Sequence, residues 1–424
     1  MQPEPPTPIH HFFGPTVVRA AFVLAMFGWG LGFYGPPIYL QAVLARTQWP
    51  VVLVSGAVTL HFLIGAVVVA QLPRLHRRLG LAHTVVFGAL ATAFGVCGWA
   101  LAAQPWQLLL AACLSGAGWV TMGAAAINAI IAPWYAQGRP MALAKAYNGA
   151  SIGGVVFLPL WSLLIGQWGF AWAASWLGIL MLCVVSALAL WVLGQTPEHL
   201  GQRADGIADA DVATVHTLAA GLTRLPGKAL WHSRASLTLA FGMAAGLFAQ
   251  IGLLAHLYAH LVPAMGSQIA GLAMGFATAC AIAGRMGLAR CMPANANRRV
   301  LACLSYGVQI AGGMLLLAAA GTQLWLFWLG LALFGAGIGN ATSLPPLIAQ
   351  QEFAREDTQR VVALIVAMAQ ASYAFAPLCF GLLLGAQLGS QKAFFGCAIL
   401  VQFLAIVGFL AGRNSPPAAA SGGK

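Results

Sequence analysis

The sequence predicts an all-α integral membrane protein with twelve transmembrane helices in two pseudo-symmetric six-helix bundles. Three observations lead to this fold class. Hydrophobic residues make up 60% of the 424 residues and charged residues only 7%, whereas about 25% of the residues in soluble domains are charged. Twelve apolar runs follow one another, each long enough to cross about 30 Å of hydrocarbon. Positions in the second half of the chain also repeat positions in the first half at a nearly constant spacing.

The predicted helices fall into two groups of six. The first group covers residues 17–40, 51–72, 84–103, 107–132, 142–165 and 169–193, and the second covers 235–260, 267–290, 300–320, 323–346, 361–384 and 391–411. Helices are expected because a helix satisfies its own backbone in lipid, and the runs lack the alternation of barrel strands. We therefore expect bundles at 17–193 and 235–411, a linker at 194–234, and tails at 1–16 and 412–424.

The positions of the basic residues predict the orientation of the chain. With a cytoplasmic N-terminus, the outer connections hold only Arg46 and Lys392, and the inner ones hold most other arginines. The net charge of +12 is spread over separate loops, so it does not indicate a nucleic-acid partner. No secretory signal is visible. We expect a monomer in the lipid bilayer of a bacterial-type inner (plasma) membrane, with both termini cytoplasmic.

Several positions recur at an offset near 220 residues. Arg77 and Arg78 recur as Arg298 and Arg299, and "LSGAG" at 114–118 recurs as "LFGAG" at 333–337. Any single match is weak in so biased a composition. Their common order and spacing indicate that a unit of six helices was duplicated.

Motifs between the runs sharpen this interpretation. The loop "PRLHRRLG" at 73–80 is similar to a G-x-L-x-D-R-x-G pattern, with Arg77 in place of the acid. The duplication, the central linker and this loop resemble the major facilitator superfamily of transporters. The stretch "APWYAQGRPMALAKAYNGASIGG" and the later "AIAGR" resemble its monocarboxylate and oxalate–formate branch. This resemblance implies that Arg285 grips a substrate carboxylate. The second anion-binding lysine of oxalate-type relatives has no counterpart in "VAMAQASYAFAP", which disfavours a dicarboxylate.

Arg285 lies inside the run 267–290, where a fixed positive charge costs roughly 2.5–3.5 kcal/mol at a helix centre. Two interpretations remain open. The side chain snorkels toward the inner end marked by Arg290, or it binds an anionic substrate. Gly284 and Gly287 leave room beside it, and no Asp or Glu lies within any predicted helix. A guanidinium fork fits a carboxylate, and a single charge suits a monoanion.

Two histidines are candidates for carrying a proton, because histidine titrates near neutral pH. His61 lies near the middle of the run 51–72, and a structural histidine bonded to a neighbouring helix is the alternative. His256 is the second candidate, as part of an outer gate. His256 and His260 also have the i,i+4 spacing of a metal-binding pair, but interfacial polar residues are ordinary there. We expect no metal site and no cofactor.

Further polar residues in the runs are candidates for contacting substrate near the midplane. Each one is also of a type that joins membrane helices structurally. These residues are Tyr34, Trp119, Thr121, Asn128, Asn340, Gln370 and Tyr373.

The stretch "QQEFAREDTQR" at 350–360 is expected to be either a solvated loop or an inner gate. In the gate interpretation its acids meet arginines of other inner loops when that side closes. The gating candidates are Arg77, Arg78, Arg139, Glu352, Glu356 and Asp357.

These features predict a secondary active transporter of a small organic anion, most simply a monocarboxylate, that works by alternating access. Proton coupling is left open. The alternative is a facilitator or exporter of neutral or lipophilic solutes, with Arg285 snorkelling. We expect no enzymatic activity, because no acid pair, metal cluster or serine motif is visible.

Overall fold

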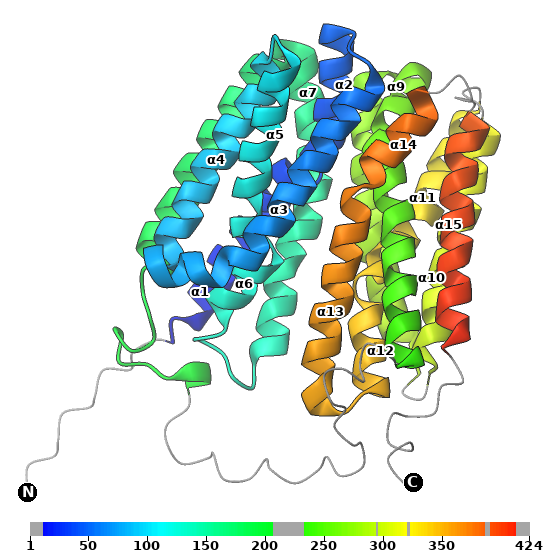
Figure 1. Ribbon diagram of the computed structural model, residues 1–424. Coiled ribbons are helices and arrows are strands. Elements are labelled where there is room, and N and C mark those ends of the chain that lie inside the picture. The colour runs from blue at the N-terminus through cyan, green and yellow to red at the C-terminus, as the bar shows by residue number, and fades with distance from the viewer. Residues whose placement is uncertain (1–11, 207–232, 294–295, 320–322, 386–390, 413–424) are drawn as a thin grey trace, which may run out of the picture.

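The computed structural model describes residues 12–206, 233–293, 296–319, 323–385 and 391–412. Within these ranges the chain is helical and forms no strand. Ten helices are long and apolar enough to cross a membrane, and the twelve predicted runs overlap them (Figure 1). They cover Gly14–Thr47, Val51–Leu79, Leu81–Leu101, Pro105–Ile131, Arg139–Leu193, Arg234–Cys291, Arg298–Ala319, Leu324–Glu352, Arg360–Gly385 and Gln391–Ala411.

Several of these helices are subdivided. In the first half of the chain the elements are α1 (Gly14–Gly32), α2 (Gly35–Thr47), α3 (Val51–Leu79), α4 (Leu81–Leu101), α5 (Pro105–Trp119), α6 (Ala124–Ile131) and α7 (Arg139–Leu188). In the second half they are α9 (Arg234–Cys291), α10 (Arg298–Ala319), α11 (Leu324–Ala341), α12 (Leu344–Glu352), α13 (Arg355–Ala374), α14 (Ala376–Gly385) and α15 (Gln391–Ala411). The short turns Val120–Met122, Ala189–Leu193 and Ala204–Gly206 complete the assignment.

Two glycines interrupt the longest helices. Gly169 in α7 has φ 79° and Gly266 in α9 has φ 77°, and each joins two helical segments across a kink. The 50 residues of α7 and 58 residues of α9 would span about 75 Å and 87 Å if straight. Glycine is the residue that adopts this left-handed backbone without a steric penalty. Gly266 falls between two predicted runs, and Gly169 is the first residue of the predicted run 169–193.

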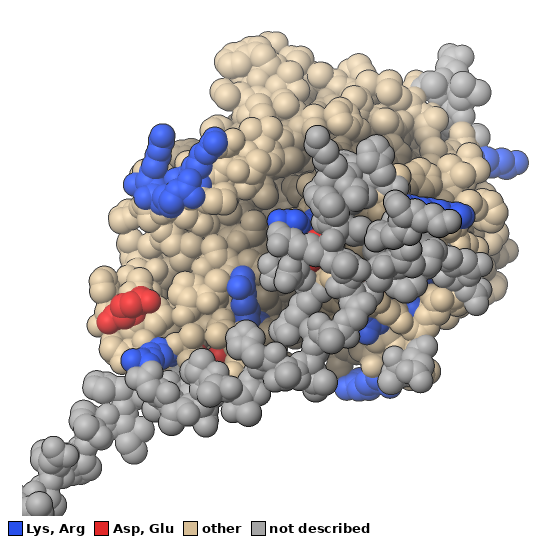
Figure 2. All heavy atoms as spheres, turned by 60° about the horizontal axis from the view of Figure 1, so that its bottom comes forward, with Lys and Arg blue, Asp and Glu red and all other residues tan. Residues whose placement is uncertain are grey.

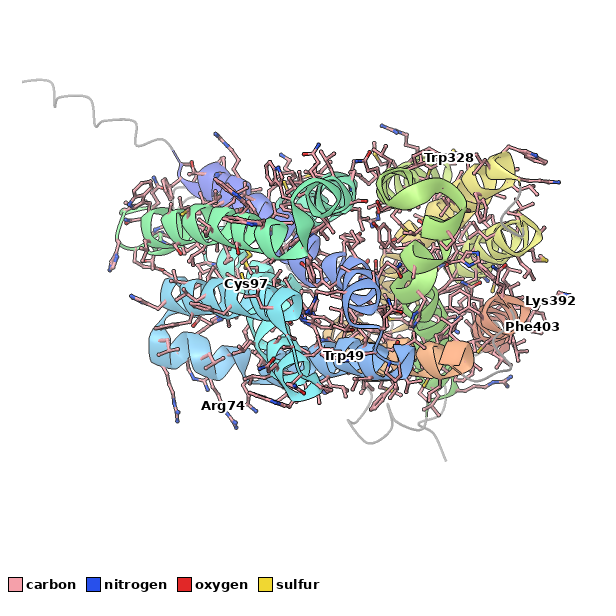
Figure 3. All side chains as sticks on the ribbon, turned by 90° about the horizontal axis from the view of Figure 1, so that it is seen from above. Trp49, Arg74, Cys97, Trp328, Lys392 and Phe403 are labelled. Atoms are coloured by element: carbon pink, nitrogen blue, oxygen red, sulfur yellow. The ribbon has the colours of Figure 1, made fainter. Side chains whose placement is uncertain are left out.

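The helices of the two halves of the chain lie on opposite sides of the molecule. Helices α1–α7 occupy one side and α9–α15 the other (Figure 1), and the view along the helices shows the same division (Figure 3). Helix α3 of the first half lies beside α14 of the second, and α7 lies beside α9. These contacts bring together segments that are far apart in the sequence.

Basic side chains gather at one end of the helices, which we call the basic end. It holds the α3–α4 connection and the starts of α7 and α10, where Lys and Arg dominate the visible charge (Figure 2). Exposed Arg74 projects from it (Figure 3). Arg46 and Lys392 lie at the other end, which we call the opposite end.

The first part of the predicted linker folds back onto the first half. The Asp205 carboxylate accepts hydrogen bonds from the backbone N–H groups of Ala136, Gln137 and Gly138, at 3.0, 2.6 and 3.1 Å. These groups precede the first turn of α7, where unpaired N–H donors favour an anion. The remainder of the predicted linker, residues 207–232, lies outside the described residues.

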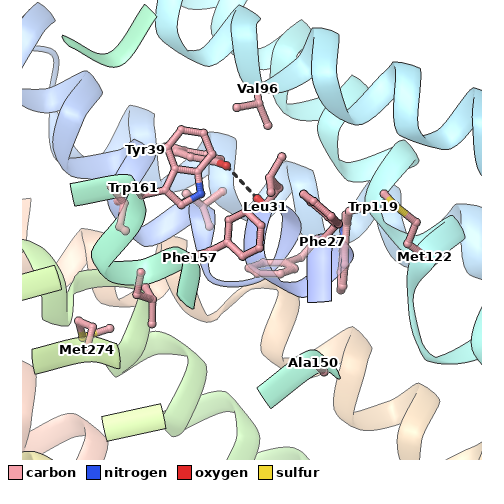
Figure 4. Close-up of a cluster of buried hydrophobic side chains, with 14 of the residues drawn as sticks. Phe27, Leu31, Tyr39, Val96, Trp119, Met122, Ala150, Phe157, Trp161 and Met274 are labelled. Atoms are coloured by element: carbon pink, nitrogen blue, oxygen red, sulfur yellow. Dashed lines mark hydrogen bonds between the residues drawn. The ribbon is translucent and has the colours of Figure 1, made fainter. Parts of the chain in front are cut away.

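The break between α1 and α2 is held by three side chains. Pro36 has no N–H, so the Gly32 carbonyl lacks the donor that a continuous helix would supply. His61 Nε2 donates to that oxygen at 2.8 Å, Tyr39 donates to the Leu31 oxygen at 3.0 Å (Figure 4), and Trp161 donates to Gly30 at 3.4 Å. Three consecutive carbonyls thus receive donors from α3, α2 and α7. The Gly-Pro-Pro sequence makes the break, and these side chains stabilise it.

This arrangement makes a testable prediction about stability. The Tyr39→Phe variant removes a donor from the break and should lower the free energy of unfolding by about 1 kcal/mol. Tyr306 is equally buried, at 1% exposure for both side chains, but its hydroxyl has no hydrogen-bond partner. Tyr306→Phe is therefore the matched control, and it should leave stability unchanged or raise it. Thermal unfolding of both variants in one detergent, followed by tryptophan fluorescence, checks the difference; equal losses would contradict it.

Candidate functional site

A small apolar cavity lies between the two halves of the chain. Its wall exposes only carbon and other apolar atoms. The first half contributes Phe33, Tyr34, Pro37, Val58, Phe62 and Leu158, and the second contributes Ile251, Leu254, Ala255 and Met274. The break between α1 and α2 therefore forms part of this wall. Of the predicted site residues, Tyr34 alone is among the lining side chains.

Toward the opposite end, the cavity is closed by close contacts between α7 and α9. Ser162 bonds Tyr258 through their hydroxyls at 3.0 Å, and it also donates to the Ser267 carbonyl. An added Cβ at Gly271 would overlap Ser162, and one at Gly275 would lie 3.2 Å from Pro159. Small residues thus let the two helices approach closely on this side.

Arg285 lies on the basic-end side of the cavity and does not line it. Its Nε donates to the Gly339 carbonyl of α11 at 2.9 Å, and Gly339 lets α9 and α11 approach closely, since an added Cβ would overlap the Ala281 oxygen. The two terminal nitrogens of Arg285 make no hydrogen bond to any described residue. The guanidinium is half-buried and retains donors for another group.

Tyr34 connects the cavity to Arg285. Its ring lines the cavity, and its hydroxyl lies on the side of the Arg285 guanidinium. An added Cβ at Gly154 of α7 would lie 2.8 Å from the Tyr34 ring and 2.6 Å from Thr278 of α9. Tyr34 therefore reaches from the first half to the segment of the second half that carries Arg285. Gly154 and Thr278 were not predicted, because small residues are common in every run.

His61 is fully hydrogen-bonded inside the first half. It is 1% exposed, its Nδ1 lies 2.9 Å from Ser115 Oγ, and its Nε2 donates to Gly32. Its ring stacks on Trp119, with centroids 6.0 Å apart and planes 10° apart. Neither side chain lines the cavity. This geometry favours the structural interpretation of His61, and proton transfer by His61 stays a prediction.

Three of the predicted contact residues bond within their own half, away from the cavity. Thr121 donates to the Gly118 carbonyl at 2.9 Å and contacts Gly88 of α4. Asn128 donates to Tyr147, and Asn340 donates weakly to the Ala336 carbonyl at 3.4 Å. The Asn128–Tyr147 bond joins α6 to α7 and the Thr121–Gly88 contact joins α4 to the end of α5, whereas the Asn340 bond lies within α11.

Tyr373 and Gln370, which were predicted to contact substrate, belong to α13 of the second half. The Tyr373 ring meets Phe62 edge to face across the two halves, with centroids 6.0 Å apart. Because Phe62 lines the cavity, Tyr373 lies directly behind its wall. Gln370, one turn nearer the start of α13, makes no hydrogen bond to a described residue.

His256 and His260 face different helices. His256 is 2% exposed and its Nε2 donates to the Pro377 carbonyl of α14 at 3.0 Å. His260 lies against the rings of Phe327 and Phe395. Within the described ranges, no group of three or more His, Cys, Asp or Glu side chains is placed to hold a metal ion.

The expectation of a loop at 350–360 is wrong. Helix α12 continues to Glu352 and α13 begins at Arg355, so only Phe353 and Ala354 separate them. Pro345 and Pro346 lie in the first turn of α12, where proline fits a helix. The helix then extends to Glu352, beyond the end of the predicted run 323–346. The acids of this stretch therefore lie at helix ends.

Glu352 pairs within its own half. It accepts two hydrogen bonds from Arg299 of α10, at 2.6 and 2.7 Å. Arg299 is 1% exposed and also donates to Thr238, the Ala235 carbonyl and the Phe409 carbonyl. One arginine thereby joins α9, α10, α12 and α15 at the basic end.

The other gating candidates belong to α3, α7 and α13. Asp357 is buried in the first turn of α13, and the Glu356 side chain lies outside the described part of the structure. Arg77 and Arg78 are exposed and Arg139 is half-buried at the start of α7. None of these arginines forms an ion pair with a described residue. A gate closed by these residues stays a prediction.

Comparisons with known proteins identify the family. The ten apolar helices are those of a multi-pass membrane protein. Residues 17–356 match the Major Facilitator Superfamily, and the chain belongs to this family. A curated relative, the MFS transporter asaE of Aspergillus flavus, is 26% identical over 138 residues, which cover 32% of this chain. The matched part is 30% of that protein's length, so the chain spans under a third of it.

Solved structures agree in fold. The nucleoside transporter NupG gives a TM-score of 0.70 at 11% identity, covering 93% of this chain and 98% of that one. A bacterial homologue of the human lysosomal transporter Spinster, in its inward-facing and occupied conformation, gives 0.62 at 14% identity, covering 95% and 96%. Identities this low show the fold alone.

The Arg299–Glu352 pair generates a second prediction. Glu352→Gln leaves a buried guanidinium without its counter-charge and should destabilise the protein by about 3 kcal/mol. Arg78→Gln removes the exposed repeat counterpart of Arg299 and should change stability by less than about 0.5 kcal/mol. Thermal unfolding in detergent measures both; equal shifts for the two variants would contradict the assigned role of the pair.

Proposed function

We propose that the chain is a secondary active transporter of a small organic anion, a monocarboxylate, that works by alternating access. In this proposal α7 and α9 each cross the membrane twice, because each is far longer than about 30 Å of hydrocarbon and has a glycine kink. The chain then makes twelve crossings in two six-helix bundles, at 17–193 and 235–411. The basic end faces the cytoplasm of an inner (plasma) membrane, as the positive-inside rule favours.

The main support for this proposal is the lack of a described partner for the terminal nitrogens of Arg285. Its terminal nitrogens have no protein partner among the described residues, and no Asp or Glu lies between residues 234 and 351 or between 358 and 411. A charge without a counter-charge is costly in a low-dielectric environment unless an anion or water meets it. A carboxylate bound there would also reach the Tyr34 hydroxyl, so the two halves would share the ligand.

The cavity favours an apolar body for the substrate. Its wall offers no polar surface, and three aromatic side chains, Phe33, Tyr34 and Phe62, belong to it. A carboxylate held by Arg285 with an aromatic or aliphatic tail in the cavity uses both features. We therefore propose an apolar-tailed monocarboxylate, for which benzoate is a suitable probe.

The apolar wall also favours a second candidate function. A carrier of neutral or lipophilic solutes would use the same cavity without a charge contact, and Arg285 would serve only to bond the Gly339 carbonyl. Benzamide has nearly the shape of benzoate without the charge. The pair therefore separates the two functions.

We expect benzoate, at about 100 times its Kd, to raise the melting temperature of the purified protein by several degrees. Benzamide at the same concentration should give no shift. Arg285→Gln should abolish the benzoate shift, whereas Arg290→Gln, at the exposed end of the same helix, should retain it. Differential scanning fluorimetry in detergent measures all four cases.

Two results would overturn the monocarboxylate proposal. A benzoate shift that persists in Arg285→Gln would remove Arg285 from the site. A benzamide shift as large as the benzoate shift would favour the carrier of neutral solutes.

A further inference from the structure

A polar seam joins the two halves near the opposite end. We define the seam as Ser55 and Thr59 of α3 together with the segment 377–381 of α14. The backbone N–H of Leu378 donates to Thr59 Oγ1 across the halves at 3.1 Å. An added Cβ at Gly381 would overlap Ser55 Oγ, so α3 and α14 are in close contact. Opening the opposite end would separate the two sides of the seam.

His256 lies at this seam with one nitrogen unused. Its Nε2 donates to the Pro377 carbonyl, which can only accept, so Nε2 carries the proton and Nδ1 holds a lone pair. Nδ1 is buried and has no hydrogen-bond partner, and the same is true of Ser55 Oγ. Both groups lie near one point, because the position of a Cβ added at Gly381 is 3.6 Å from His256 Cε1 and overlaps Ser55 Oγ.

We propose that His256 Nδ1 is a proton-binding site that becomes accessible from the opposite end when the seam opens. This inference rests on the alternating access in the proposed function. In the closed seam the imidazole is neutral and buried. When α3 moves away from α14, water reaches Nδ1 and a proton binds.

Protonated His256 would oppose closure of the seam. The described groups placed against the ring by its printed contacts are Pro377 and Gly381 of α14, Phe394 of α15 and, beside Gly381, Ser55 of α3, and none of these titrates or carries a charge. On its own helix the nearest titratable groups are Tyr258, whose hydroxyl bonds Ser162 of α7, and His260, one turn away. An imidazolium enclosed by these neighbours would lack a counter-charge, and such burial is costly. The proton site and the state of the seam are therefore coupled.

His61 does not offer the same coupling. Both of its ring nitrogens have partners within the first half, and separation of the halves would leave those partners in place. His256 is in contact with the moving boundary.

The test measures the opening of the seam against pH. Spin labels are placed on Ala45→Cys and Lys392→Cys, exposed positions on either side of the opposite end, after the eight native cysteines are replaced. Distances are recorded by double electron–electron resonance in lipid nanodiscs from about pH 8 to about pH 5, the range in which histidine titrates. We expect the longer distance to gain several-fold in population as the pH falls.

Variants separate His256 from other titrating groups. His256→Gln should make the distance distribution independent of pH, and His260→Gln should retain the dependence. His256→Asn replaces His256→Gln if the latter does not fold. A pH dependence unchanged in the His256 variant, or the absence of a longer distance at any pH in the parent protein, overturns the proposal. Benzoate binding is measured separately, so its loss alone would overturn only the substrate assignment.

Discussion

Backbone carbonyls without helical donors organise the first half of this protein. In lipid an unsatisfied carbonyl costs several kcal/mol, so the break made by Pro36 and Pro37 requires donors from elsewhere. His61, Tyr39 and Trp161 supply them from three helices. Because these donors fix the break, Phe33, Tyr34 and Pro37 are held at the wall of the cavity. The position of the candidate substrate site thus follows from one requirement of the membrane environment.

In the second half, a buried ion pair and its hydrogen bonds join the helices. Arg299 is buried, paired with Glu352 and bonded to two further helices. Its counterpart in the repeat, Arg78, is exposed and forms no ion pair with a described residue. The duplicated halves therefore retain matching positions while using them differently. Neutral hydrogen bonds at the α1–α2 break join helices of the first half, whereas an ion pair at the basic end joins helices of the second half.

The sequence predicted the apolar helices well, because hydrophobic length is a direct requirement of the bilayer. It also indicated Arg285 and Tyr34, since charge and glycine–proline breaks are conspicuous in apolar runs. It did not indicate which way smaller polar residues point. Thr121, Asn128 and Asn340 bond within their halves, and Ser55 and Thr278 gave no signal at all. A small polar side chain in an apolar run can form a hydrogen bond either to a neighbouring helix or to a ligand. The sequence does not distinguish these two roles.

The contact between α7 and α9 has a mechanical consequence. Gly271 and Gly275 bring α9 close to α7 over a short stretch, where an added Cβ would overlap Ser162 or lie 3.2 Å from Pro159. In the proposed alternating access, the two halves would tilt about this stretch. The tilt would widen the space between the halves at one end and narrow it at the other. Arg285, about 10 Å along the helix from Thr278, would lie on one side of this stretch and Ser267 on the other. Bulk added at Gly271 or Gly275 would hinder this tilt by meeting α7, at positions that contact neither Tyr34 nor Arg285.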